Sequence, residues 1–166
     1  MTYSLNTLNA SAAAKSPPRT GAARFGHEIG LLVGLLALVF WLLALVSYSA
    51  QDAAWSTSGA RDARAVANWA GRLGAWLADG SYFAMGFSVW LCVAAGVRAW
   101  LSSLARWMRG GEAVAGAASP LVRRATFWLG LVVLMGSSTA LEWSRLYRFE
   151  SFLPGHAGGV LGYLTG

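Results

Sequence analysis

The sequence has little charge, one cysteine and one lysine. Of its 166 residues 12% are charged, compared with roughly 25% in an average soluble domain, and 56% are hydrophobic. The single cysteine, Cys92, excludes an internal disulfide, and with two distant histidines it makes no plausible metal site. The single lysine, Lys15, is not part of a GxxxxGK[ST] phosphate-binding loop, which is absent from these residues. A mean hydropathy of +0.48 therefore favours a membrane protein.

Motifs for catalysis are also missing. His27-Glu28 is not followed by the spacing of an HExxH zinc motif, and no GxSxG nucleophile motif occurs. The long apolar runs contain no Asp, Glu, Lys, Arg or His, which proton relays and ion pathways in membranes usually require. We therefore expect no catalytic residue, no bound metal and no cofactor in this part of the protein.

What the sequence does contain is three charge-free runs, at residues 29–51, 80–97 and 125–141. An α-helix rises about 1.5 Å per residue, so roughly 20 residues cross a hydrocarbon layer of about 30 Å. The sequence predicts an all-α membrane protein with transmembrane helices at about 29–49, 80–98 and 125–141. The first run is longer than the apolar core of a signal peptide and follows 28 residues, which favours a retained crossing.

The segments between these runs predict two further helices. Apolar residues recur at three- and four-residue steps in 60–79 and in 98–109, with arginines between them. This pattern is typical of amphipathic helices that lie in the membrane interface. Residues 1–24, rich in Ala, Ser, Thr and Pro without periodicity, are predicted to be a disordered head.

The arginines predict the orientation. The head and the segment 98–124 carry an excess of positive charge and lie on the same side of the membrane if the chain crosses three times. The positive-inside rule places both in the cytoplasm. A net charge of +6 could also suggest nucleic-acid binding, but these cations lie between apolar runs. We expect contacts with lipid headgroups from the arginines of the segment 98–124: Arg98, Arg106, Arg109, Arg123 and Arg124.

Glycines at four-residue spacing predict close helix packing. Gly26, Gly30 and Gly34 form two overlapping GxxxG units, and the spacing repeats at the end of the chain in Gly158, Gly162 and Gly166. Because the chain has 20 glycines, chance spacing is an equal alternative. Glu142 and Arg145, three residues apart, are predicted to form an exposed ion pair of little energetic value.

The segment 52–79 is the expected outer loop, and four of its residues are candidate contacts with a partner. They are Trp55, Trp69, Trp76 and Asp79. The alternative, that the indoles only anchor the loop in the headgroup region, stays open.

Three ordered elements carry a family resemblance. Ser47-Tyr48, Asp52 and Trp55-Ser56 form the first; Asn68, Gly71 and GAWLAD at Gly74–Asp79, then Phe83 and Gly86, form the second. The third is LPGHAGGVLG, from Leu153 to Gly162. Together they resemble the membrane region of FtsK-type bacterial DNA translocases, the FtsK/SpoIIIE family. Ala53 and Ala54 stand where that family more typically has Pro and Ser.

The resemblance implies an N-terminal membrane-anchoring domain with four transmembrane helices in the bacterial inner membrane, at the division septum. It implies contacts with other septal membrane proteins and roles in cell division and chromosome partition. A hexameric motor would follow, and ATP, Mg and DNA would bind only there.

We accordingly expect residues 25–166 to be a truncated form of this domain, without its fourth helix and without the motor. Such a fragment is expected to be non-catalytic. The alternative is a subunit of a small multi-pass transporter or channel. That role would need a polar pore lining, for which the runs offer a few hydroxyls and one thiol: Ser88, Ser137, Ser138, Thr139 and Cys92.

Overall fold

The structure, a computed structural model, describes residues 21–56, 66–109 and 120–166. Every regular element in these ranges is a helix, and three stretches are long and apolar enough to cross a membrane, which confirms the predicted fold class. The elements are α2 (Gly21–Val46), α3 (Gly71–Met85), η1 (Gly86–Ser88), α4 (Val89–Met108), α5 (Pro120–Arg145), η2 (Tyr147–Phe152) and α6 (Gly159–Thr165).

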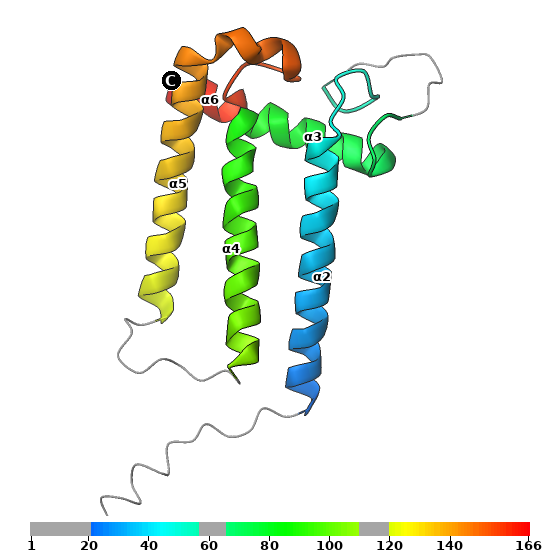
Figure 1. Cartoon of the computed structure of the whole chain (residues 1–166). Coiled ribbons are helices and arrows are strands. Elements are labelled where there is room, and N and C mark those ends of the chain that lie inside the picture. Colours follow the sequence, from blue (N-terminus) through cyan, green and yellow to red (C-terminus); the bar gives the residue numbers. More distant parts are fainter. Residues whose placement is uncertain (1–20, 57–65, 110–119) are drawn as a thin grey trace, which may run out of the picture.

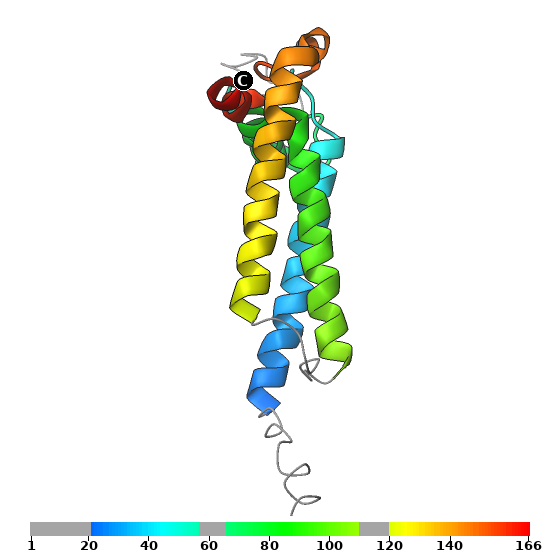
Figure 2. The ribbon, with the colours of Figure 1, turned by 90° about the vertical axis from the view of Figure 1, so that its left-hand side faces the viewer.

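The long helices α2, α4 and α5 stand side by side, and the short elements gather at one end of them (Figures 1 and 2). α3 lies crosswise over the ends of α2 and α4 (Figure 1). We call this end, with α3, η1, η2 and α6, the capped end. At the opposite end α2 begins, α4 finishes and α5 begins; we call it the arginine end.

The second crossing differs from the prediction. Residues 80–88 belong to α3 and η1, and the long helix α4 covers Val89–Met108, not 80–98. The chain turns at Gly86, whose φ of +58° lies in the left-handed region that favours glycine. The apolar stretch Gly71–Met108 is thus bent into a crosswise helix and an upright one.

The two predicted interfacial helices are also corrected. The first begins at Gly71, not at 60, and continues to Met85, while residues 57–65 lie outside the described ranges. The second, at 98–109, is the continuation of α4. α2 begins at Gly21, before the expected end of the head, and residues 1–20 lie outside the description.

The buried core sits at the capped end. Its members are Ala44, Leu45, Ala78, Tyr82, Val89, Val93, Leu153 and Ala157. Along α2 and α5, by contrast, many large apolar side chains are exposed, including Leu36, Leu129 and Val132. An apolar surface of this extent suits a hydrocarbon solvent, in which the polar groups of a helix backbone are already satisfied internally.

Candidate functional site

Buried carboxylates join the elements of the capped end, and Asp52 is the first. It accepts hydrogen bonds from the backbone N–H groups of Ala67 (2.8 Å) and Asn68 (2.9 Å). Asn68 in turn donates its amide to the carbonyl oxygen of Ala44 at 2.8 Å, near the end of α2. The loop after α2 is therefore bonded to the segment that leads into α3.

Asp79 is the second carboxylate and is completely buried. Its two oxygens accept hydrogen bonds from the backbone N–H (2.8 Å) and the hydroxyl (2.6 Å) of Ser56. Burial, reinforced by the nearby Asp79 carboxylate, raises the pKa of Tyr48 above its ordinary value. The Tyr48 phenol therefore stays neutral, with its ring 5.0 Å from that of Tyr82. The first two sequence elements that carry the family resemblance thus meet at Asp79.

Glu142, near the end of α5, is the third carboxylate. It accepts hydrogen bonds from the backbone N–H of Phe87 (2.8 Å), the backbone N–H of Gly158 (3.2 Å) and the hydroxyl of Ser88. The prediction of an exposed Glu142–Arg145 ion pair is wrong. Glu142 is only 5% exposed, and among the described residues the one ion pair within 4 Å is His156–Glu150.

Glycines allow the backbone segments around Glu142 to approach each other. Gly158 and Gly159 have φ values of +79° and +61°, in the left-handed region. A Cβ on Gly86 would lie 2.5 Å from the Gly158 nitrogen, and one on Gly159 would lie 2.6 Å from the Phe83 carbonyl oxygen. The third sequence element of the family resemblance therefore packs backbone to backbone against the turn at Gly86.

The two glycine stripes predicted from the sequence have different surroundings. Gly162 faces the Thr139 carbonyl, and Gly166 faces the Trp143 ring, so this stripe packs α6 against α5 within the chain. Of the other stripe, Gly34 approaches Trp100 on α4, whereas Gly26 and Gly30 have nothing within 4 Å of a built Cβ. Packing of Gly26 and Gly30 against another helix stays a prediction.

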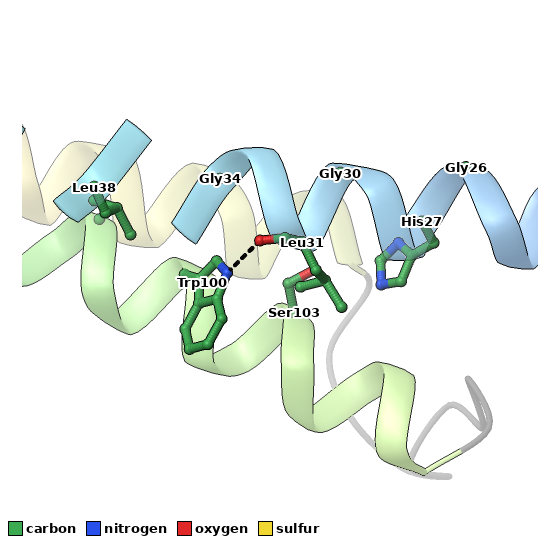
Figure 3. A pocket seen from close by; sticks show the side chains of 9 residues that line it. Gly26, His27, Gly30, Leu31, Gly34, Leu38, Trp100 and Ser103 are labelled. Atoms are coloured by element: carbon green, nitrogen blue, oxygen red, sulfur yellow. Dashed lines mark hydrogen bonds between the residues drawn. The ribbon is translucent and has the colours of Figure 1, made fainter. Parts of the chain in front are cut away.

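Gly26, Gly30 and Gly34 line a groove of about 410 Å³ between α2 and α4 near the arginine end. The Trp100 indole crosses this groove and donates a hydrogen bond to the Leu31 carbonyl oxygen at 2.9 Å (Figure 3). This hydrogen bond between α4 and α2 therefore already closes part of the groove within the chain.

The tryptophans predicted to contact a partner are on the surface of the capped end. Trp55, Trp69 and Trp76 are 63%, 74% and 53% exposed, and Trp55 packs edge-on against Phe83 with ring centroids 5.2 Å apart. Asp79, predicted with them, is interior and bonded to Ser56, so it contributes to the fold of the chain itself. Contact of the three indoles with a partner stays a prediction.

Four of the five arginines predicted to meet lipid headgroups lie near the arginine end. Arg106, Arg109, Arg123 and Arg124 are exposed there, together with Arg24 near the start of α2. Arg98 differs from the prediction because it lies halfway along α4. Contacts of these side chains with headgroups stay a prediction.

The arrangement has the chemistry of a scaffold. Each carboxylate accepts hydrogen bonds from nearby backbone or hydroxyl groups, and within the described ranges no three His, Cys, Asp or Glu side chains come together as metal ligands do. Sequence reasoning missed Glu142, although an acid within an otherwise apolar stretch beside Ser137, Ser138 and Thr139 was a usable signal. The fold and the site thus define a multi-pass helical membrane domain held together at one end.

Comparison with known proteins gives the family. Residues 23–166 match the model described as the 4TM region of DNA translocase FtsK/SpoIIIE. The chain belongs to this family and is an FtsK-type N-terminal membrane domain of the inner membrane. Family membership implies membrane association and a role in the division machinery. No solved structure matches the chain.

The relatives are much longer than this chain. DNA translocase FtsK 2 of Ralstonia nicotianae is 35% identical over 156 residues, which cover 89% of this chain and 20% of the relative. DNA translocase FtsK of Pseudomonas syringae is 31% identical over 144 residues, 82% of this chain and 16% of the relative. The chain spans about a fifth of the length of such relatives and matches only the membrane region, without the motor. Neither comparison favours a transporter or channel subunit.

Proposed function

We propose that this domain anchors a DNA translocase in the inner membrane at the division septum, with its N-terminus in the cytoplasm. The domain itself is non-catalytic; ATP, Mg and DNA bind to the motor, which also forms the hexamer. The match of residues 23–166 to the membrane region of FtsK/SpoIIIE carries this proposal. The anchor acts by spanning the bilayer and by contacting other septal membrane proteins.

The charge distribution supports this orientation. Five exposed arginines lie at the arginine end, where the described residues contain one acid, Glu28: Arg24, Arg106, Arg109, Arg123 and Arg124. The described part of the capped end has three exposed arginines (Arg72, Arg145 and Arg148) and four acids (Asp52, Asp79, Glu142 and Glu150), so the excess of positive charge is at the arginine end. Bacterial membrane proteins keep an excess of Lys and Arg on the cytoplasmic side. The arginine end therefore faces the cytoplasm and the capped end faces the periplasm.

Cysteine labelling tests the orientation. In a Cys92→Ala background, Gln51→Cys at the capped end should react with a membrane-impermeant maleimide on intact spheroplasts. Gly21→Cys at the arginine end should react only after permeabilisation, because the bilayer shields it. Both positions are exposed. Labelling of Gly21→Cys, but not of Gln51→Cys, on intact spheroplasts would reverse the proposed topology.

The exposed indoles at the capped end support a contact with septal proteins. Large exposed aromatic side chains are frequent anchors of protein interfaces. The backbone beneath them is held by the Asp52 and Asp79 hydrogen bonds, so the indoles stand on an ordered surface. Such a surface meets a partner without first having to fold.

The double variant Trp69→Ala/Trp76→Ala of the full-length protein tests this contact. We expect septal enrichment of a fluorescent fusion to fall about tenfold, the size of effect typical of lost aromatic anchors. The matched control is Trp107→Ala/Trp128→Ala, which removes two exposed indoles elsewhere on the bundle and should leave septal enrichment unchanged. Equal septal enrichment of both double variants and wild type would mean that Trp69 and Trp76 only anchor to headgroups.

A further inference from the structure

Arg98 lies at the middle of a long helix. It is nine residues after Val89, where α4 begins, and ten before Met108, where α4 ends. With a rise of about 1.5 Å per residue, it is about 14 Å from either end of the helix. If α4 spans the bilayer as proposed above, the Arg98 backbone lies close to the midplane.

Arg98 has no acidic partner among the described residues. The side chain is exposed, and in the three described ranges the one ion pair within 4 Å is His156–Glu150, far along the chain. Arg98 lines a groove of about 380 Å³ between α4 and α5. The other residues that line this groove are Leu91, Ala94, Ala95, Phe127, Gly130, Leu131 and Leu134.

The composition of this groove suits another helix. Ala94, Ala95 and Gly130 are small, and small side chains let a neighbouring helix approach closely in a membrane. A charged side chain at mid-depth is costly in lipid, and such side chains commonly face the interior of a helix bundle and pair with a group of opposite charge. The groove therefore combines room for a helix with a demand for a carboxylate.

A second copy of this chain does not supply that carboxylate. The acidic residues of α2 and α5 are Glu28 and Glu142, and α4 has none. Gly96 faces Leu38 and Trp100 faces Gly34, so Arg98 is level with about residue 36 of α2, roughly 12 Å along the axis from Glu28. Glu142 bonds to Ser88, which is about 15 Å along the axis from Arg98. In a membrane that both copies cross in the same direction, neither acid reaches the depth of Arg98.

α6 does not fill the groove either, because it packs on another face of α5. α6 meets α5 at Gly136 and Trp143, whereas Phe127 and Leu134 line the groove. Each of these groove residues is nine positions from one of the contact residues, which is two and a half turns of a helix with 3.6 residues per turn. The groove and α6 therefore lie on opposite faces of α5.

We propose that the α4–α5 groove is the docking site for a transmembrane helix of a different membrane protein. That helix carries an Asp or Glu at mid-depth, and its carboxylate pairs with the Arg98 guanidinium. This inference rests on the proposed transmembrane placement of α4, but not on septal location or on the tryptophans. It assigns a partner by its chemistry: an apolar helix with one buried acid.

A designed helix tests the pairing. The full-length protein, with Cys92 and any further native cysteine replaced by Ala and a donor dye on Arg109→Cys, is reconstituted in liposomes. The probe is a Leu/Ala peptide of about 20 residues with one central Glu and an acceptor dye, and its matched control has Leu in place of the Glu. Energy transfer should show that the Glu peptide binds about tenfold more tightly than the Leu peptide.

Variants identify the residue responsible. Arg98→Leu should bind both peptides equally, Arg98→Lys should keep the preference for Glu, and Ala95→Leu should weaken binding of both by filling the groove. If Arg98→Leu does not elute as folded protein, the Lys and Ala95 variants decide alone. Equal binding of both peptides to wild type, or an undiminished preference in Arg98→Leu, would overturn the proposal. The labelling of Gly21→Cys and Gln51→Cys tests separately whether the helices cross the membrane. A wrong membrane topology can therefore be told apart from a wrong assignment of the groove.

Discussion

Glu142→Ala should destabilise the domain more than any other single truncation of a side chain. The change removes the common acceptor of the Phe87 and Gly158 N–H groups and of the Ser88 hydroxyl. Buried donors left without an acceptor cost about 1–3 kcal/mol each, so we expect a loss of about 3–5 kcal/mol in the free energy of unfolding. Equilibrium unfolding in mixed micelles, followed by tryptophan fluorescence, measures this loss.

Two matched variants show whether the acceptor is responsible. Glu142→Gln keeps an acceptor oxygen at the same position and should lose only about 1 kcal/mol. Glu150→Ala removes a more exposed carboxylate, paired with His156 at 3.3 Å, and should change stability by about 0.5 kcal/mol or less. If Glu142→Ala unfolds at the same detergent concentration as Glu150→Ala, the Glu142 cluster does not hold the capped end together.

Gly159→Ala is the second large effect that we expect. Gly159 has a φ of +61°, and a Cβ there would lie 2.6 Å from both the Ala84 carbonyl carbon and the Phe83 carbonyl oxygen. These are backbone atoms that cannot rotate away, so the change adds overpacking to an unfavourable backbone conformation. The sum is about 3 kcal/mol or more, measured by the same unfolding experiment.

Gly80→Ala is the control for this steric explanation. Gly80 lies within α3, and a Cβ there meets nothing within 4 Å. Alanine is a better helix former than glycine by about 1 kcal/mol, so Gly80→Ala should be neutral or stabilising. Similar destabilisation by both changes would refute the steric explanation for Gly159.

The all-α fold, the number of crossings and the family were accessible from the sequence because they depend on local composition and short motifs. The bounds of the second crossing were not. The prediction took Arg98 as the end of that crossing, since charges usually mark the membrane surface. In the structure the bend at Gly86 shifts α4 toward the arginine end and leaves Arg98 halfway along the helix.

The hydrogen bonds of the capped end were also beyond the sequence patterns. Glu142 bonds with Phe87, 55 residues away, and Asp79 with Ser56, 23 residues away. A prediction from sequence spacing considers side chains three or four positions apart on a helix, and it therefore paired Glu142 with Arg145. Long-range partners depend on how the helices pack, which periodicity does not specify.

The crosswise position of α3 has a mechanical consequence. Leu73 and Trp76 of α3 are exposed, as is Trp69 just before it, while Asp79 of the same helix is buried and bonded to Ser56. An amphipathic helix of this kind lies in the interface between water and hydrocarbon. In the proposed placement, a force that pulls the bundle toward its arginine end would have to move α3, lying crosswise and with its buried carboxylate, into the hydrocarbon layer. With the domain placed in the membrane as proposed, we therefore expect α3 to resist movement of the three upright helices through the bilayer.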